Sequence, residues 1–418
     1  MKEILNFLIK ISKLKEIPRT GLIWLGVKKP ETVAEHTFII AFAAWLLGKE
    51  KKLDIEKLIK ISLSHDICEV FAGDMTPFWG LLPKDEEKRK EILKRWIRFP
   101  IKEKEERARK KFKVEENALL KLIKPLKEDI RKEILTSWLN YEKKFTKEGK
   151  FAKQIDQIMG MIEAICHLDV KKRVWITPWW EEAEETIDDP LLLEFLKVIQ
   201  KKFYGWKVKY LKELESILDL LLEIGKLKKL PRRIWHLLEA KDPLETVAGH
   251  VFSVSLMTWI FGREKKELNM ERLLKMALCH EIAAVYTNDL TPYDTILAKG
   301  GEKKEIFKKW LHLPRKEKEK IHFQHYKKER KALKKLTLKL RNPFKKEIIR
   351  LFDEYRTVSS AEARFLNQVN AISVLLQALL YWKKDKKLQI DWMWEWALEK
   401  CEDPIILEFL DTLKEKFY

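Results

Sequence analysis

The chain has 418 residues, of which 46% are hydrophobic and 36% charged, a mixture typical of globular proteins that argues against long disordered regions. Its length exceeds the size at which one hydrophobic core keeps growing, so two domains of roughly 200 residues are expected. A net charge of +20 favours anionic partners such as nucleotides, but Lys and Glu alternate along the chain, so a solvated surface explains the charge equally well.

The first residues, MKEILNFLIKISKLKEIPRTG, place lysine and glutamate among the apolar positions, which an uninterrupted signal-peptide core would not tolerate. No run reaches the ~20 apolar residues of a membrane span, so no membrane partner is expected. The cysteines are scattered without a CxxC pair, at Cys68, Cys166, Cys279 and Cys401. This usage is typical of a reducing cytoplasm. The richness in Lys, Glu and Ile resembles that of proteins from heat-loving organisms.

The apolar run FIIAFAAWLLG, which begins two residues after His36, predicts a buried core helix. A second helix is expected over LDIEKLIKISLSHDICEVFAGD, which carries the adjacent pair His65 and Asp66. Adjacent helical residues point about 100° apart, so the pair can share one metal ion only if the ion lies in the wedge between their directions. That wedge would lie between helices, where helical bundles commonly build metal sites.

A third expected helix, FAKQIDQIMGMI, places Asp156 among residues with buried spacing. A buried carboxylate without a partner is costly, and either a metal ion or the side chain of Lys153 would relieve that cost. Taken alone, each of these polar residues would more often be a buried side chain whose hydrogen bonds are made within the core. Together, in this order, they predict a metal site.

The second half of the chain repeats the first almost without gaps. The segment ETVAEH, ending at His36, recurs as ETVAGH, ending at His250, and DPLLLEFLKVIQKKFY recurs as DPIILEFLDTLKEKFY. Such a long period indicates duplication of a whole domain. Because helical spacing dominates and strand-like alternation is absent, we expect an all-α fold of two tandem bundles, residues 1–206 and 207–418, packed as a pseudo-dimer. Either a monomer with this internal pseudo-dimer or a homodimer of the chain is consistent with that expectation.

The second copy keeps His250, His280 and Asp289 but departs from the first at positions that bear charge. It has Glu281 for Asp66, Ala284 for Glu69, Asn370 for Asp156 and Gly249 for Glu35. Asparagine brings no negative charge and alanine can neither accept a proton nor hold a water. Although Glu281 could still act as a ligand, we therefore expect metal affinity and turnover to fall in the second copy, which would be a structural or regulatory partner of the first.

The pattern ETVAEH, SHDICEVFAGD and KQID resembles the HD-domain phosphohydrolases, and most closely the 5′-deoxynucleotidase branch. The resemblance covers nearly all of residues 1–204 and includes the flanking PRTG. It implies an HD-domain bundle with one divalent metal ion per chain, of an identity left open among Mn²⁺, Co²⁺, Mg²⁺, Zn²⁺, Ni²⁺ and Fe²⁺. It also implies four metal ligands, namely His36, His65, Asp66 and Asp156.

The same resemblance implies roles for four further residues. Glu69 would activate or orient the attacking water and Asp74 would pass a proton toward the leaving oxygen, or the two roles would be exchanged. Arg19 would contact the substrate phosphate, with Lys153 as a second candidate. The implied reaction is release of phosphate from (deoxy)nucleoside 5′-monophosphates in the first domain only. Members of this family often have Trp after the glycine of PRTG, whereas this chain has Leu22.

Two other functions stay open from the sequence. A phosphodiesterase acting on cyclic or short oligonucleotides would use the same residues, although many such enzymes bind two metals and need more histidines than the first domain has. A non-catalytic protein that holds nucleotides or nucleic acid would use the net charge and the sixteen tryptophans. Nucleic acid is therefore an open partner and not a specified one.

Overall fold

The computed structural model describes residues 1–418 except 77–78, 82, 84, 86–87, 89–90, 93–98, 169–175 and 298–302. Over these described residues the chain is helical, and its only β contacts are two isolated bridges, Pro18 with Thr32 and Pro231 with Thr246. The prediction of an all-α fold is confirmed. Among the same residues, no helix is both long and apolar enough to cross a membrane.

Contacts divide the chain into two compact units. The first unit is Lys13–Leu221, and the second combines Met1–Ser12 with Leu222–Tyr418. These spatial units differ from the two sequence repeats, 1–206 and 207–418, at the first helix of each repeat.

Helix α1 (Lys2–Ile11) begins the first sequence repeat but contacts α23 (Pro404–Phe417) of the second unit. Two ion pairs join these helices, because the Met1 amino group lies 3.9 Å from Glu408 and Lys2 lies 3.0 Å from Glu415. Helix α12 (Lys212–Ile224) begins the second repeat, but most of it, up to Leu221, belongs to the first unit. The two repeats have therefore exchanged their first helices.

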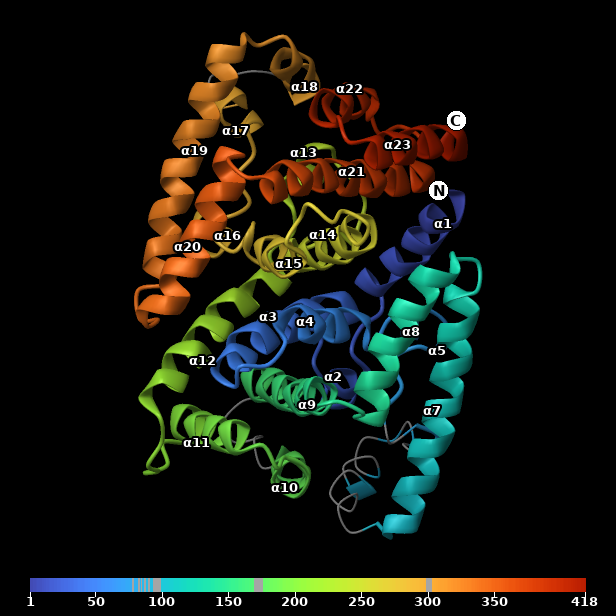
Figure 1. The fold of residues 1–418 in the computed structure, drawn as a ribbon, viewed down its shortest axis with the longest axis vertical. Helices are drawn as coiled ribbons and strands as arrows, with labels where there is room; N and C mark the ends of the chain where they lie inside the picture. The colour runs from blue at the N-terminus through green and yellow to red at the C-terminus, as the bar shows by residue number, and fades with distance from the viewer. Residues whose placement is uncertain are drawn as a thin grey trace. The chain divides into compact units, whose positions relative to one another are not determined.

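The described part of the first unit consists of helices (Figure 1). In chain order they are η1 (Ser12–Lys15), α2 (Thr20–Trp24), α3 (Val33–Glu50), α4 (Ile55–Ser64), α5 (Glu69–Ala72), α7 (Ile101–Ile123), α8 (Glu128–Lys143), α9 (Lys147–His167), α10 (Thr177–Thr186) and α11 (Pro190–Tyr204), followed by α12.

The core of the first unit lies where α3, α4 and α9 pack against one another (Figure 1). Helix α3 is buried on all sides from Val33 to Gly48, as its apolar sequence predicted. It begins with a capping box, in which the Thr32 hydroxyl accepts from the Glu35 amide and the Glu35 carboxylate accepts from the Thr32 amide. This cap fixes the point at which α3 starts and thereby the position of His36 in its first turn.

The second unit repeats this arrangement around α14, α15 and α21 (Figure 1). Besides α1 and α23, its helices are η4 (Gly225–Lys229), α13 (Arg233–Leu237), α14 (Val247–Gly262), α15 (Met270–Cys279), α16 (Ala284–Thr287), α17 (Tyr293–Leu297), α18 (Lys303–Leu311), α19 (Arg315–Leu336), α20 (Asn342–Thr357), α21 (Ala361–Lys384) and α22 (Asp391–Lys400).

The short helices α5 and α16 end in the same way. Gly73 follows α5 with φ of +73°, and Asn288 follows α16 with φ of +58°. Glycine and asparagine are the residues that most readily adopt positive φ. Directly after this turn comes Asp74 in the first unit and Asp289 in the second.

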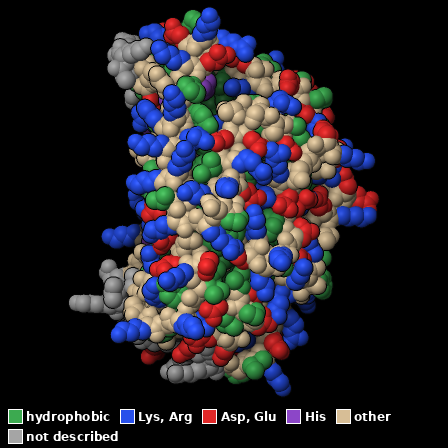
Figure 2. Space-filling model, turned by 60° about the vertical axis from the view of Figure 1, so that its left-hand side comes forward, with side chains coloured by type: hydrophobic (Ala, Val, Ile, Leu, Met, Phe, Trp, Pro, Cys, Tyr) green, Lys and Arg blue, Asp and Glu red, His purple; other side chains and the backbone are tan. Residues whose placement is uncertain are grey.

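Basic and acidic side chains intermingle over the face drawn in Figure 2, and neither sign gathers into one continuous patch on that face. Elsewhere, basic and acidic side chains pair at i,i+4 spacing along helices, such as Lys110 with Glu106 on α7 and Lys132 with Glu128 on α8. The visible distribution therefore matches the mixed runs of Lys and Glu in the sequence.

Candidate metal and phosphate site

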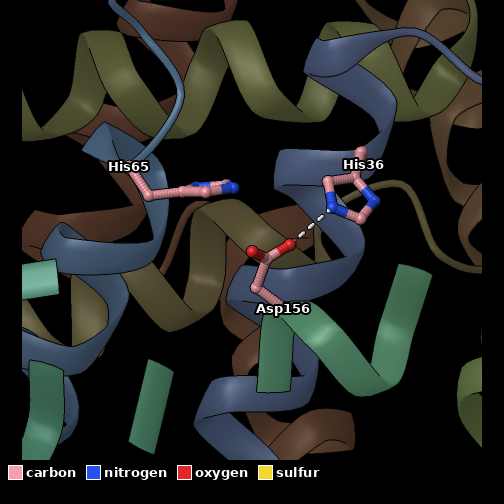
Figure 3. Close-up of side chains that lie close together, drawn as sticks. All are labelled: His36, His65 and Asp156. Carbon is pink, nitrogen blue, oxygen red and sulfur yellow. Dashed lines mark hydrogen bonds and ion pairs between the residues drawn. The ribbon is translucent and has the colours of Figure 1, made fainter. Parts of the chain in front are cut away.

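Three of the four predicted metal ligands meet in the core of the first unit. His36 comes from the first turn of α3, His65 from the end of α4 and Asp156 from the middle of α9. One ligand atom of each lies within 4.8 Å of the others (Figure 3). Both histidines are buried and Asp156 is half-buried. The packing of α3, α4 and α9 therefore gathers side chains that are 120 residues apart in sequence.

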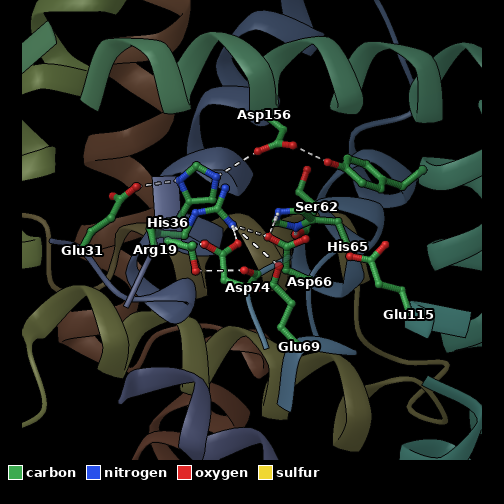
Figure 4. A network of polar contacts seen from close by, with 12 residues as sticks. Arg19, Glu31, His36, Ser62, His65, Asp66, Glu69, Asp74, Glu115 and Asp156 are labelled. Carbon is green, nitrogen blue, oxygen red and sulfur yellow. Dashed lines mark hydrogen bonds and ion pairs between the residues drawn. The ribbon is translucent and has the colours of Figure 1, made fainter. Parts of the chain in front are cut away.

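Each histidine is held through its Nδ1 atom. Nδ1 of His36 lies 2.8 Å from the buried carboxylate of Glu31, and Nδ1 of His65 lies 2.6 Å from the backbone oxygen of Ser62 (Figure 4). Because both partners only accept, Nδ1 carries the proton in each ring. The Nε2 atoms are then left to face the centre of the cluster, which is the orientation that a metal-binding histidine needs.

Asp66, the fourth predicted ligand, lies beside His65. Its Oδ2 atom is 3.0 Å from Nε2 of His65 and 2.9 Å from Nη1 of Arg19. Burial alone would raise the pKa of Asp66, but His65 and Arg19 together hold it well below its usual range. The carboxylate is therefore ionised and available as a ligand.

The set of donors fits a divalent cation. Two imidazole nitrogens and two ionised carboxylates are the ligand types that Zn²⁺, Mn²⁺, Co²⁺ and Fe²⁺ accept. The buried Nε2 atom of His65 lies 3.0 Å from the Asp66 carboxylate, and the two groups together would suit a cation. At His36, burial opposes protonation, but the carboxylates of Glu31 and Asp156 raise its pKa to about 9. Such a concentration of negative charge also attracts a metal ion.

Arg19 stands between the acidic residues of the site. Its Nη1 atom donates to Asp66 at 2.9 Å and to Asp74 at 3.1 Å, and lies 3.9 Å from Glu69 (Figure 4). The Asp74 carboxylate also accepts from the backbone amide of Thr20, so Asp74 anchors the start of α2. Arg19 is thereby held at the mouth of the metal cluster.

Glu69 lies in the first turn of α5 and is 2% exposed. Burial and the nearby carboxylates of Asp66 and Asp74 raise its pKa well above the ordinary value, although Arg19 opposes the shift. Its Oε2 atom is buried without a hydrogen-bond partner among the described residues. Glu69 is therefore a carboxyl group with a free oxygen beside the cluster.

Lys153, the second candidate for contact with the substrate phosphate, does not pair with Asp156. Its Nζ atom donates to Glu142 at 2.9 Å and lies 4.0 Å from the centre of the Tyr141 ring. Asp156 instead accepts from Tyr141 and contacts His36. Lys153 nevertheless lines the same cavity as Arg19.

A cavity of about 370 Å³ opens over the cluster. Its polar wall holds six of the eight predicted site residues, namely Arg19, Asp66, Glu69, Asp74, Lys153 and Asp156. Apolar side chains form another part of the wall, namely Leu22, Trp24, Leu25, Met75, Met161 and Trp179. The cavity therefore joins a charged floor to an apolar side.

The sequence interpretation missed the residues that orient the ligands. Glu31 fixes His36, and Tyr141 donates to Asp156. A signal for both was present, because Glu31 recurs as Glu245 and Tyr141 as Tyr355 in the second repeat. Only the contacts between α3, α8 and α9 show what these residues do.

The second unit keeps part of the cluster. His250, His280 and Glu281 also present ligand atoms within 4.8 Å of one another, and all three are buried. In place of Asp156, however, Asn370 contacts Nε2 of His250 at 2.9 Å. The position of Glu69 is taken by Ala284.

Comparisons with known proteins found a matching family and similar sequences. The family described as HD domain matches residues 11–183 and again 224–393. The 5'-deoxynucleotidase HDDC2 of Xenopus laevis is 31% identical over 172 residues, which cover 41% of this chain and 73% of that protein. The 5'-deoxynucleotidase hdd1 of Schizosaccharomyces pombe is 29% identical over 188 residues, 44% of this chain and 91% of that protein. A solved conserved hypothetical protein from Pyrococcus furiosus shares 25% identity over 47% of this chain and 99% of its own, with a TM-score of 0.35.

Proposed function

The chain belongs to the HD domain family of metal-dependent phosphohydrolases, in two tandem copies, and on that premise we propose that its first unit releases phosphate from deoxynucleoside 5′-monophosphates. The observation that carries the proposal is the cluster of His36, His65 and Asp156, of which Asp156 lines one cavity together with Arg19. The relatives named as 5'-deoxynucleotidases support the choice of substrate.

The metal would be held by His36, His65, Asp66 and Asp156. A divalent ion bound there lowers the pKa of a water molecule and offsets charge on the phosphoryl group. Glu31 and the backbone oxygen of Ser62 keep the two imidazole rings turned toward the ion.

The other polar residues would act on the substrate and on protons. Arg19 offers a guanidinium whose fork geometry suits two phosphate oxygens. Glu69, with its free Oε2 atom, exchanges a proton with the attacking water. Asp74 keeps Arg19 in place and passes a proton toward the leaving oxygen. Lys153 adds a second positive charge at the cavity wall.

The apolar side of the cavity would receive the nucleoside. Trp24 and Trp179 line this side, and aromatic rings stack on bases with little regard to sequence. A cavity of about 370 Å³ falls in the usual range for small-molecule sites. The apolar residues of the lining thus supply a surface for the base.

Turnover would be confined to the first unit. The second unit lacks counterparts of the Asp156 and Glu69 carboxylates, since Asn370 and Ala284 stand there. Both changes remove negative charge from the position at which a metal and a water would be held.

The direct experiment is phosphate release from the four deoxynucleoside 5′-monophosphates, their ribose forms and a cyclic nucleotide, each with Mn²⁺, Co²⁺ or Mg²⁺. We expect turnover of at least one deoxynucleoside monophosphate, and loss of that turnover in Asp66→Ala and in Glu69→Ala. Hydrolysis of the cyclic nucleotide alone would replace the proposal with a phosphodiesterase. No turnover with any substrate and metal would remove the enzymatic proposal.

A further inference from the structure

The second unit holds a cavity of about 560 Å³, larger than that of the catalytic site in the first unit. It opens over the same place in the fold, since Arg232, Tyr355 and Asn370 line it where Arg19, Tyr141 and Asp156 line the first. A domain that had merely lost its chemistry would not need to keep so large an opening.

An arginine lies close to the position of the metal in this cavity. Arg356 stands where the first repeat has Glu142. Its guanidinium pairs with the buried Glu329, and its Nη2 atom lies 3.8 Å from Glu281, the counterpart of the ligand Asp66. Glu281 also accepts from Arg232 at 3.2 Å. The carboxylate that would ligate a metal is thus committed to two guanidinium groups.

The histidine that corresponds to His36 is also unsuited to a metal. Asn370 donates through Nδ2 to the Tyr355 hydroxyl at 2.9 Å, and its oxygen then faces Nε2 of His250 at 2.9 Å. The amide oxygen brings no negative charge to this position, so the pair of His250 and Asn370 attracts a cation less than the pair of His36 and Asp156 does. The anchor on Nδ1 is also weaker, because Glu245 lies 3.9 Å away where Glu31 lies 2.8 Å from His36.

The charges that line the two cavities differ in sign. Four cationic and six acidic side chains line the catalytic cavity, a formal charge of −2 that a divalent cation would neutralise. Four cationic and three acidic side chains line the second cavity, a formal charge of +1. The cations are Arg232, Lys318, Arg356 and Lys400. This cavity is therefore charged to receive an anion.

One of these cations keeps unused hydrogen-bonding capacity. The Nε atom of Arg356 is buried without a hydrogen-bond partner among the described residues. Arg356 itself lines the cavity, and its side chain is 26% exposed. An anion bound in the cavity would satisfy the guanidinium further, since charged groups without full pairing are costly to bury.

Aromatic rings form part of the lining of the second cavity. They are Tyr293, Trp310, Phe323, Tyr326, Trp392 and Trp396. Trp392 is itself fixed, because it stacks on Phe307 at 4.5 Å and meets Tyr293 edge-on. Aromatic rings and a guanidinium in one cavity suit a ligand with a flat ring at one end and a negative group at the other.

We propose that the second unit is a metal-independent binding site for a nucleoside monophosphate, which it holds through Arg356 and its aromatic wall without hydrolysing it. The phosphate would lie at Arg356 and the base against the ring of Trp396 or Trp392. This site goes beyond the catalytic proposal, because it needs neither metal nor turnover.

The test is calorimetric titration of the full chain with dAMP, dCMP, dGMP and dTMP in excess EDTA. We expect at least one of these nucleotides to bind once per chain, and Arg356→Gln to weaken that binding by about tenfold or more, the usual effect of losing a charged hydrogen bond. Arg356→Lys should restore part of the affinity. Deoxyadenosine and inorganic phosphate, titrated alone, should each bind more weakly than the matching nucleotide.

Three variants serve as controls. Arg315→Gln removes one charge from the same unit at a side chain that is 92% exposed, and binding should be unchanged. Arg19→Gln reports on the catalytic cavity, and binding in EDTA should survive it. Lys400→Glu places the opposite charge at an exposed residue of the cavity wall and should weaken binding even if Arg356→Gln disturbs folding.

Three results would overturn the proposal: no nucleotide binds in EDTA, binding persists in both Arg356→Gln and Lys400→Glu, or Arg19→Gln abolishes it. These outcomes are independent of catalysis. A chain without phosphatase activity that binds nucleotide through Arg356 would refute the catalytic proposal and support this one.

Discussion

Asp156 and Asn370 occupy the same place in the two units and make the same two contacts, but the hydrogen bond to the tyrosine hydroxyl runs in the opposite direction. Each has an oxygen 2.9 Å from Nε2 of the histidine in the first turn of a buried helix. Asp156 accepts from the hydroxyl of Tyr141, whereas Asn370 donates to the hydroxyl of Tyr355. One change of side chain thus preserves the packing and removes the negative charge.

The first prediction copies that change into the first unit. Asp156→Asn should lower metal affinity by at least about 100-fold, because a charged ligand counts for more than the ligand-orienting contacts whose loss costs 10–100-fold. Equilibrium dialysis with Mn²⁺ or Co²⁺ measures the effect. Packing should survive, since Asn370 already fills the same position in the second unit.

Asn370→Asp is the matched control for that variant. It should create no second tight metal site, because Arg356 and Arg232 still hold Glu281. A second tightly bound ion in Asn370→Asp would show that the amide alone, and not the arginines, excludes the metal.

Glu31 should matter for metal binding although it would not touch the ion. Its carboxylate lies 2.8 Å from Nδ1 of His36 and fixes the orientation of the ring. Glu31→Gln should therefore weaken metal binding about 10–100-fold, and turnover should be restored when metal is added in excess. Glu245→Gln, the equivalent change in the second unit, should leave metal affinity as it was. Equal effects of the two variants would contradict this role for Glu31.

A substitution of Glu69 should slow the chemical step without changing metal binding. Glu69→Gln should keep the metal content of the wild type and lower kcat by about 10²–10⁴-fold, the usual contribution of proton transfer by a positioned side chain. Single-turnover kinetics and elemental analysis of the same sample measure both quantities. Glu105→Gln, at an exposed position of α7, is the neutral control. Loss of metal in Glu69→Gln would make this residue a ligand.

The exchange of α1 and α12 predicts which of the two units a core mutation in either helix destabilises. Phe7 of α1 is 2% exposed and belongs to the second unit, whereas Leu220 of α12 is 2% exposed and belongs to the first. Phe7→Ala should cost about 3–5 kcal/mol and Leu220→Ala about 2–5 kcal/mol of the stability of those units. Hydrogen exchange should quicken in α23 for Phe7→Ala and in α11 for Leu220→Ala. The reverse pattern would show that each helix packs within its own sequence repeat.

Sequence patterns predicted the all-α fold and the duplication, because helical spacing and the repeat around His36 and His250 are local features of the chain. They also predicted which side chains lie at the site, since His36, His65 and Asp156 sit on apolar helices that must pack together. The exchange of α1 and α12 was not predictable in this way. An apolar helix face specifies that it will be buried, but not against which of two similar bundles.

The role of Arg356 was hidden for a related reason. In the sequence Arg356 is one of many basic residues. It occupies the position that Glu142 has in the first repeat, but only the structure shows that this places an arginine on α20 beside Glu281 and Glu329. The orienting contacts of Glu31 and Tyr141 likewise depend on distances between helices, which periodicity does not give.

The most direct test of the account is the metal content of the purified full chain, measured by elemental analysis together with turnover. The account predicts one tightly bound divalent ion per chain, lost together with activity in Asp66→Ala and retained in Glu281→Ala. Two equivalent ions per chain, or an ion that survives Asp66→Ala and is lost in Glu281→Ala, would contradict it.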